Sequence, residues 1–264
     1  MLNGLLTVNI ELTSRCNKNC WMCGRRKIDR DFPEISMNYG DMDFELIEKI
    51  APQIPEGIIV QFHNNGEPLM YPRLGEVLKL FNGKIRCLDT NGKLLLEKID
   101  QINENLESIT ISTFQDDTEW EEQYNILIDY LEKKYNKPQV IIRVLGEVGA
   151  KRLQLYKDTG CLIAYRTLHS PMGSFNYEKK TVVPEHGICL EMLSHPAINR
   201  FGDVSTCVRF DPYKELVIGN LNNQTFEEIW YGKKRMKLVN KHINGERNKI
   251  PFCSKCEFYG IPRG

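Results

Sequence analysis

The sequence predicts an α/β protein, a partial (β/α)6 TIM-like barrel followed by a small cysteine-rich segment. Six short apolar or alternating runs, typical of strands, fall within residues 1–166, and helical patterns separate them. Strands that alternate with helices form a parallel sheet with right-handed crossovers. Six such units fall short of the eight that close a barrel, so we expect an open one. The nine cysteines of the chain gather mainly near its two ends.

The first strand is expected over residues 5–12, where LLTVNIEL runs directly into a loop rich in cysteine. The other strands are expected at 58–62, 84–88, 108–113, 139–144 and 161–165. Helices are expected at roughly 43–51, 72–82, 93–101, 117–135 and 147–157. In the longest helix, Asp117 or Thr118 can act as the N-cap. Its buried face is expected to consist of Trp120, Tyr124, Leu127, Leu131 and Tyr135.

The pattern changes after the sixth unit. Residues 167–188 are polar and contain prolines and glycines, which is typical of a linker. From residue 189 onward, short hairpin-like pieces and a helix near 225–243 lead to a terminal CxxC pair. We therefore expect a barrel over 1–166, a linker over 167–188 and a small domain over 189–264 that depends on metal for its stability.

Composition narrows the classes of function. The chain has 264 residues, 35 Lys and Arg against 35 Asp and Glu, and a net charge of zero, which argues against a general nucleic-acid binder. No apolar run is long enough to span a membrane, and the start does not read as a signal peptide. An odd number of cysteines without a secretion signal favours metal or redox chemistry over disulfides, and we expect a cytoplasmic protein.

Three cysteines lie within eight residues, Cys16, Cys20 and Cys23. Because their neighbours in the sequence are polar, the three side chains cannot all lie in the hydrophobic core. Free thiols so close together would oxidise unless a metal bound them. Zinc requires four ligands, whereas an iron–sulfur cube on three thiolates keeps one iron open. A second set has four thiols and suits either zinc or a closed cluster: Cys189, Cys207, Cys253 and Cys256.

The Cys16-x3-Cys20-x2-Cys23 pattern after the first strand resembles the signature of radical S-adenosylmethionine (SAM) enzymes. This resemblance implies a 4Fe–4S cluster whose open iron binds SAM. Two further motifs support it, the GEP-like stretch 65–68 after the second strand and the TNG-like turn 90–92 after the third. It implies SAM contacts from Met22, Asn65, Gly66, Glu67, Pro68, Asn91, Ser112 and Arg143. Met22 stands where the family usually has an aromatic residue, and Asn65 replaces the first glycine of the GGEP motif.

The C-terminal cysteines, with the GDVSTC stretch 202–207 and the IGNL stretch 218–221, resemble a SPASM/Twitch auxiliary-cluster domain. Because no cysteine follows Cys256, the resemblance favours the shorter Twitch form with one further 4Fe–4S cluster. The spacing of the cysteines and the length are similar to those of the 2-deoxy-scyllo-inosamine dehydrogenase type of the butirosin pathway. The resemblance thus implies an oxidoreductase that uses SAM and two 4Fe–4S clusters.

In such an enzyme, reductive cleavage of SAM gives a 5′-deoxyadenosyl radical that removes a hydrogen atom from the substrate. A closed second cluster is suited to accept an electron, so we expect two-electron oxidation of a small polar substrate, a sugar or aminocyclitol alcohol. The base for the hydroxyl proton would be His63, His169 or Glu11. The alternative is a peptide-modifying epimerase or crosslinking maturase, in which Cys161 would donate hydrogen. Either enzyme would need a flavodoxin- or ferredoxin-like electron donor.

A non-enzymatic electron carrier or zinc-stabilised binding protein is the other class of hypothesis. A pure carrier has no need of an open-iron triplet, a GEP motif or a six-unit sheet, so the motifs favour an enzyme. The basic stretch 233–237 lies in an expected helix, where it would form a solvated face. The sequence does not identify the substrate.

Overall fold

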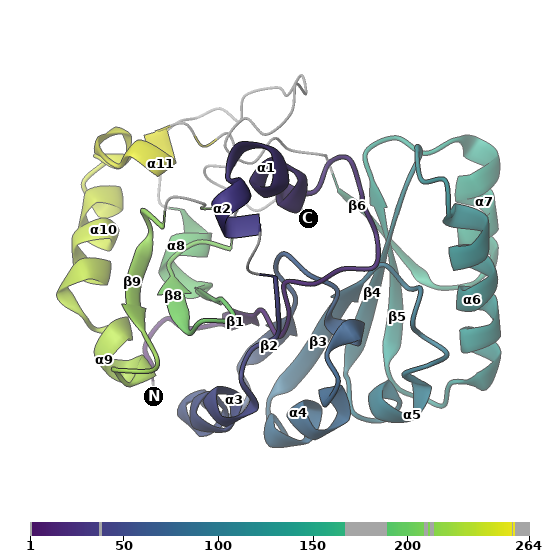
Figure 1. The fold of residues 1–264 in the computed structure, drawn as a ribbon, viewed down its shortest axis with the longest axis horizontal. Coiled ribbons are helices and arrows are strands. Elements are labelled where there is room, and N and C mark those ends of the chain that lie inside the picture. Colours follow the sequence, from purple (N-terminus) through teal and green to yellow (C-terminus); the bar gives the residue numbers. More distant parts are fainter. Residues whose placement is uncertain are drawn as a thin grey trace.

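The computed structural model describes residues 2–36, 39–166, 189–208, 211, 214–254 and 256. Its strands form one nine-stranded sheet in the order β6-β5-β4-β3-β2-β1-β7-β8-β9 (Figure 1). The parallel part consists of β1 (Thr7–Ile10), β2 (Ile59–Phe62), β3 (Ile85–Thr90), β4 (Ser108–Phe114), β5 (Gln139–Leu145) and β6 (Leu162–Arg166). The C-terminal strands are β7 (Ala197–Ile198), β8 (Asp203–Ser205) and β9 (Val217–Asn220). The six expected parallel strands are confirmed.

Helices cover the outer side of the parallel strands (Figure 1). The helices of the first part are α1 (Gly24–Asp31), α2 (Pro33–Ser36), α3 (Phe44–Ile50), α4 (Leu74–Leu80), α5 (Ile99–Ile102), α6 (Trp120–Lys133) and α7 (Ala150–Asp158). Those of the C-terminal part are α8 (Leu190–Ser194), α9 (Phe226–Trp230), α10 (Lys233–Ile243) and α11 (Pro251–Ser254). Among the described residues, no helix is both long and apolar enough to cross a bilayer.

The two faces of the parallel sheet differ in chemistry. Outward-facing side chains such as Val8, Ile10, Val60 and Phe62 are fully buried in one core with the apolar faces of the helices. The opposite, inner face carries polar side chains on strand after strand: Asn9, Gln61, Asp89, Thr110, Ser112 and Arg143. Strands buried on both faces are normally apolar throughout, so this polar inner face indicates a binding site.

The longest helix differs from expectation at both ends. It begins at Trp120, and Asp117 lies in the preceding turn, where its Oδ1 accepts the Glu119 amide at 3.1 Å. The N-cap position is taken by Glu119, so neither Asp117 nor Thr118 is the cap, and Asp117 Oδ2 pairs with Lys18 instead. The helix ends at Lys133, so Tyr135 lies beyond it and is 72% exposed instead of buried. The helix expected over 93–101 is reduced to the single turn of α5.

The C-terminal strands continue the barrel sheet. β7 pairs in parallel with β1, with Asn9 opposite Ala197 and Ile10 opposite Ile198, and β8 and β9 follow antiparallel. The hairpin pieces expected after residue 189 are therefore present, but they join the barrel through β1. The expected linker 167–188, with His169, lies outside the described residues.

Candidate active site

The cysteine loop leaves the carboxyl end of β1. Cys16, Cys20 and Cys23 are all free thiols and partly buried. Burial, and after it the neighbouring Cys23 thiol, raise the pKa of Cys20 to about 12. Neutral thiols are the form that such crowding favours in the absence of a cation, and a metal would displace their protons. The donor set of three thiolates fits a cube with one open corner.

A buried ion pair anchors this loop to the sheet. Lys18 Nζ lies 2.5 Å from Asp117 Oδ2, and the two side chains are 4% and 3% exposed. The ammonium group also lies 5.7 Å from the centre of the Phe114 ring. Because Phe114 ends β4, the pair joins the loop after β1 to the segment that follows β4, three strands away in the sheet.

The GEP-like stretch packs directly on the segment between β1 and the cysteine triplet. A Cβ on Gly66 would lie 2.0 Å from the carbonyl oxygen of Thr13 and 2.8 Å from that of Arg15. The amide of Glu67 donates to the Arg15 carbonyl at 2.8 Å. Only glycine permits this approach of two backbones, and the contact fixes the loop after β2 against the loop after β1.

Glu67 joins the ends of β2 and β3. Its Oε1 accepts the Thr90 hydroxyl at 2.7 Å and the Leu69 amide at 3.0 Å, and its Oε2 accepts the Asn91 amide at 2.8 Å. Burial raises its pKa to about 7, although these hydrogen bonds oppose the shift. The carboxylate that was expected to contact SAM is thus engaged within the protein, where it orders the turn that holds Asn91.

Asn91 and Asn65, two further expected SAM contacts, bridge neighbouring loops. Asn91 Nδ2 donates to Asn17 Oδ1 at 2.8 Å and lies 3.8 Å from Cys16 Sγ. Asn65 Nδ2 donates to Glu11 Oε2 at 3.1 Å. Glu11 is 5% exposed, and burial raises its pKa. The structure therefore gathers these residues at the carboxyl ends of β1, β2 and β3.

The inner face holds a charged pair that the sequence did not reveal. Arg143 on β5 forms an ion pair with Asp89 Oδ2 on β3, and Gln61 Nε2 donates to Asp89 Oδ1 at 3.1 Å. Burial alone would raise the pKa of Asp89, but His63 and Arg143 outweigh it and hold the pKa at about 2. Arg143, expected to meet the SAM carboxylate, has its guanidinium on Asp89 here.

His63, which follows β2, faces the same pair. Its Nε2 lies 3.6 Å from Asp89 Oδ2, and its Nδ1 lies 3.4 Å from the Asn9 amide nitrogen. Burial lowers the pKa of His63, and Arg143, Arg166 and His195 lower it further, while Asp89 opposes them. A neutral imidazole can accept a proton as a general base, and the neighbouring Asp89 carboxylate would stabilise the imidazolium that forms.

The inner face also reaches the C-terminal part of the chain. His195 Nε2 lies 2.5 Å from Asn9 Oδ1, and its Nδ1 lies 2.8 Å from Glu191 Oε2. Asn9 and His195 were missed from the sequence, together with Asp89. For Asn9 and Asp89 the available signal was the recurrence of polar residues at alternate positions of strands that are otherwise apolar, whereas His195 lies outside the strands.

The structure separates Cys161 from this site. Cys161 precedes β6, whose first residue Leu162 pairs with Ile141 of β5, so it lies at the amino edge of the sheet. The cysteine loop and the polar inner face lie toward the carboxyl edge, and a five-residue strand at ~3.3 Å per residue separates the two edges by roughly 17 Å. Cys161, expected as a hydrogen donor of a peptide-modifying enzyme, therefore stands at the start of β6 and away from the cysteine loop. Ser112 lies on the inner face opposite Arg143, and Met22 lies in the cysteine loop.

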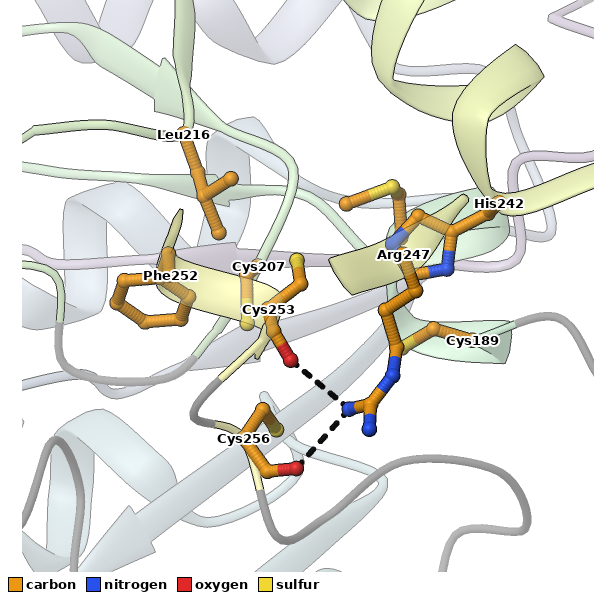
Figure 2. Close-up of a pocket in the computed structure, with 9 residues that line it drawn as sticks. Cys189, Cys207, Leu216, His242, Arg247, Phe252, Cys253 and Cys256 are labelled. Carbon is orange, nitrogen blue, oxygen red and sulfur yellow. Dashed lines mark hydrogen bonds between the residues drawn. The ribbon is translucent and has the colours of Figure 1, made fainter. Parts of the chain in front are cut away.

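The four remaining expected ligands surround one cavity (Figure 2). It is lined by Cys189, Met192, Cys207, Leu216, His242, Arg247, Phe252, Cys253 and Cys256. Burial raises the pKa of Cys253 to about 12, and the neighbouring thiols add to it. Among the described residues no group of side chains converges on a single ion position. Four thiols spread around a cavity suit a cube, which places each thiolate on a separate iron.

Comparison with known proteins agrees with this geometry. Residues 189–257 match the SPASM family, described as an iron–sulfur cluster-binding domain. The S-adenosyl-L-methionine-dependent 2-deoxy-scyllo-inosamine dehydrogenase of Niallia circulans is 23% identical over 256 residues, 94% of this chain and 91% of the relative. The tungsten-containing aldehyde ferredoxin oxidoreductase cofactor-modifying protein of Pyrococcus furiosus is 33% identical over 95 residues, which span 34% of this chain and only 25% of that relative.

Solved structures share the fold over most of the chain. BtrN in complex with AdoMet and 2-DOIA superposes with a TM-score of 0.66 at 17% identity, covering 96% of this chain and 92% of BtrN. SuiB of Streptococcus suis bound to S-adenosylmethionine gives a TM-score of 0.67 at 13% identity, covering 96% of this chain and 72% of SuiB. The expected fold class, a partial barrel with a C-terminal iron–sulfur segment, is confirmed.

Proposed function

We propose that this chain, a radical SAM enzyme with a C-terminal SPASM iron–sulfur domain, oxidises a small polar alcohol by two electrons. The polar inner face carries the proposal, because it places a histidine, a carboxylate and an arginine beside the cysteine loop. A sugar or aminocyclitol offers hydroxyl and amino groups that such a surface can bind by hydrogen bonds. The relative from Niallia circulans, named as a 2-deoxy-scyllo-inosamine dehydrogenase, supports this class of substrate.

Two sets of residues would hold the cofactors. Cys16, Cys20 and Cys23 would bind the 4Fe–4S cluster that reacts with SAM, and the four cysteines around the cavity would bind the second. Bound there, these groups supply the acceptors for one carbon-bound hydrogen atom and one electron of the substrate. A flavodoxin- or ferredoxin-like protein is the proposed source of reducing electrons.

The chain's own residues perform the remaining step, removal of the hydroxyl proton. His63 is proposed as its acceptor because burial favours the neutral imidazole and Asp89 lies 3.6 Å away to stabilise the charged one. Arg143 pairs with Asp89 Oδ2 and Gln61 donates to Asp89 Oδ1, so Asp89 stays ionised. The proton would go to the other ring nitrogen, Nδ1, once the substrate hydroxyl replaces its long 3.4 Å contact with the Asn9 amide nitrogen. Glu11, whose carboxylate accepts the Asn65 amide, is the weaker candidate.

The test is anaerobic reconstitution followed by two separate measurements. We expect about eight irons per chain and reductive formation of 5′-deoxyadenosine from SAM. With 2-deoxy-scyllo-inosamine and a panel of related aminocyclitols and sugars, we expect one ketone per 5′-deoxyadenosine. Zinc in place of iron, or reconstituted protein that leaves SAM intact under reduction, would reject the proposal.

Peptide modification is a second candidate, favoured by the likeness to SuiB. The structure of SuiB bound to the precursor peptide SuiA covers 87% of this chain and 65% of SuiB, with a TM-score of 0.65. The two candidates differ in their products. A mass loss of about two hydrogens in a small alcohol supports the first, whereas deuterium exchange or a crosslink in a peptide, with no reaction of any alcohol, supports the second.

A further inference from the structure

Arg247 occupies a specific place in the cavity that the four cysteines surround. It belongs to a short 3-10 turn, Arg247–Lys249, that leads into α11. Its Nη1 donates to the carbonyl oxygens of Cys253 at 2.8 Å and Cys256 at 3.0 Å (Figure 2). The guanidinium is thus held by the backbone of the CxxC pair that carries two of the four thiols.

The rest of the cavity wall makes this charge effective. Met192, Leu216 and Phe252 are 3%, 0% and 4% exposed, so water is largely excluded on their sides. Among the nine residues that line the cavity, Arg247 is the one whose side chain carries a permanent charge. A charge in a dry, weakly polarisable wall acts more strongly on its neighbours than the same charge in water.

We infer that Arg247 raises the reduction potential of the iron–sulfur cluster that these four cysteines hold, an inference that rests on the proposed cofactor content. Reduction adds one negative charge to a cluster whose ligands are already anionic. A fixed positive charge nearby stabilises the reduced form more than the oxidised one, and net charge and hydrogen bonding are established determinants of cluster potential. Arg247 therefore makes the C-terminal cluster a better electron acceptor.

The test isolates the C-terminal cluster in the full-length chain. In a Cys16→Ala, Cys20→Ala, Cys23→Ala background, each variant is reconstituted anaerobically, its iron and sulfide are counted, and its potential is measured by redox titration monitored by electron paramagnetic resonance. Arg247→Gln should bind iron normally and lower the reduction equilibrium constant about tenfold, which is about 59 mV for one electron. Arg247→Lys should restore the potential to within a third of that shift.

Lys249→Gln provides the matched control. It removes the same charge from the same turn, but Lys249 is exposed, pairs with Glu246 at 2.5 Å and does not line the cavity. Its potential should equal that of the parent. Equal potentials for Arg247→Gln and the parent, with four irons bound in each, would overturn the inference.

The lysine variant separates a purely structural role of Arg247 in holding the cluster from an electrostatic one. If Arg247→Gln binds no cluster, Arg247→Lys decides the question, because lysine keeps the charge and loses the two-bond geometry of the guanidinium. A loaded Lys variant with the parent potential supports the inference, and failure of both variants to hold iron overturns it. If the parent itself binds no iron at this site, the proposed function fails instead.

Discussion

Replacing Gly66 by alanine should dismantle the amino-terminal cluster site. The new Cβ would lie 2.0 Å from the Thr13 carbonyl oxygen, whereas ordinary contacts between such atoms are about 3.5 Å, so the two loops must separate by about 1.5 Å. That movement breaks the 2.8 Å hydrogen bond from the Glu67 amide to the Arg15 carbonyl. Overpacking costs about 1–3 kcal/mol and the lost hydrogen bond about 1 kcal/mol, so we expect a loss of about 2–4 kcal/mol.

Thermal unfolding and iron analysis together measure this effect. For a chain of this size, that loss lowers the unfolding temperature by roughly 5–15 °C. Reconstituted Gly66→Ala protein should retain its C-terminal cluster, lose most of the amino-terminal one and form no 5′-deoxyadenosine. The control is Gly149→Ala, because the nearest atom to its new Cβ is Gln115 Oε1 at an ordinary 3.4 Å. A Gly66→Ala variant with the parent unfolding temperature and full SAM cleavage would refute the close approach of these loops.

Three further predictions follow from the site. Lys18→Met leaves the Asp117 carboxylate buried without its partner and should lower the free energy of unfolding by about 3–5 kcal/mol, measured by chemical denaturation. The double variant Lys18→Met, Asp117→Leu should recover most of this loss. Equal stability of the single and double variants would contradict the prediction. His63→Gln should abolish ketone formation while SAM cleavage persists. Because the base must be neutral, turnover of the parent should fall only as pH drops below about 6.5. Asp89→Asn should move that fall to still lower pH, since Asp89 raises the pKa of His63. If turnover of Asp89→Asn falls at the same pH as that of the parent, Asp89 does not control the pKa of His63. Cys161→Ala should leave turnover unchanged within twofold, since that thiol lies at the opposite edge of the sheet.

The strands were predictable because their signal is local. Runs such as 108–113 and 139–144 are apolar over a few residues, and the observed β4 and β5 each extend them by a single residue. The helix expected over 93–101 shows where local signals fail. Its leucines do pack against the core, but they do so from turns, and only Ile99–Ile102 is helical. Periodicity reports which side chains are buried and does not by itself fix the backbone that buries them.

The ligands of the site were predictable and its pairings were not. All seven expected cysteine ligands fall at two places in the structure, because their spacing carries the information. Asp117 was expected as a helix cap, since its actual partner, Lys18, is 99 residues away in the chain and outside any local pattern. Arg143 similarly pairs with Asp89 two strands away. Long-range pairs of this kind depend on the order of strands in the sheet, which a single sequence does not display.

The pairing of β7 with β1 has a consequence for the edge of the parallel sheet. A six-stranded open sheet would end at β1, and the exposed amides of that strand would invite pairing with another molecule. Here the amides of Leu6, Asn9 and Glu11 donate to the carbonyls of Ser194, Pro196 and Ile198 at 2.9–3.0 Å. The C-terminal segment thus covers the edge at which the parallel sheet would otherwise end, independently of any electron transfer. A chain without the second cluster would therefore still need β7 to cover this edge of the sheet.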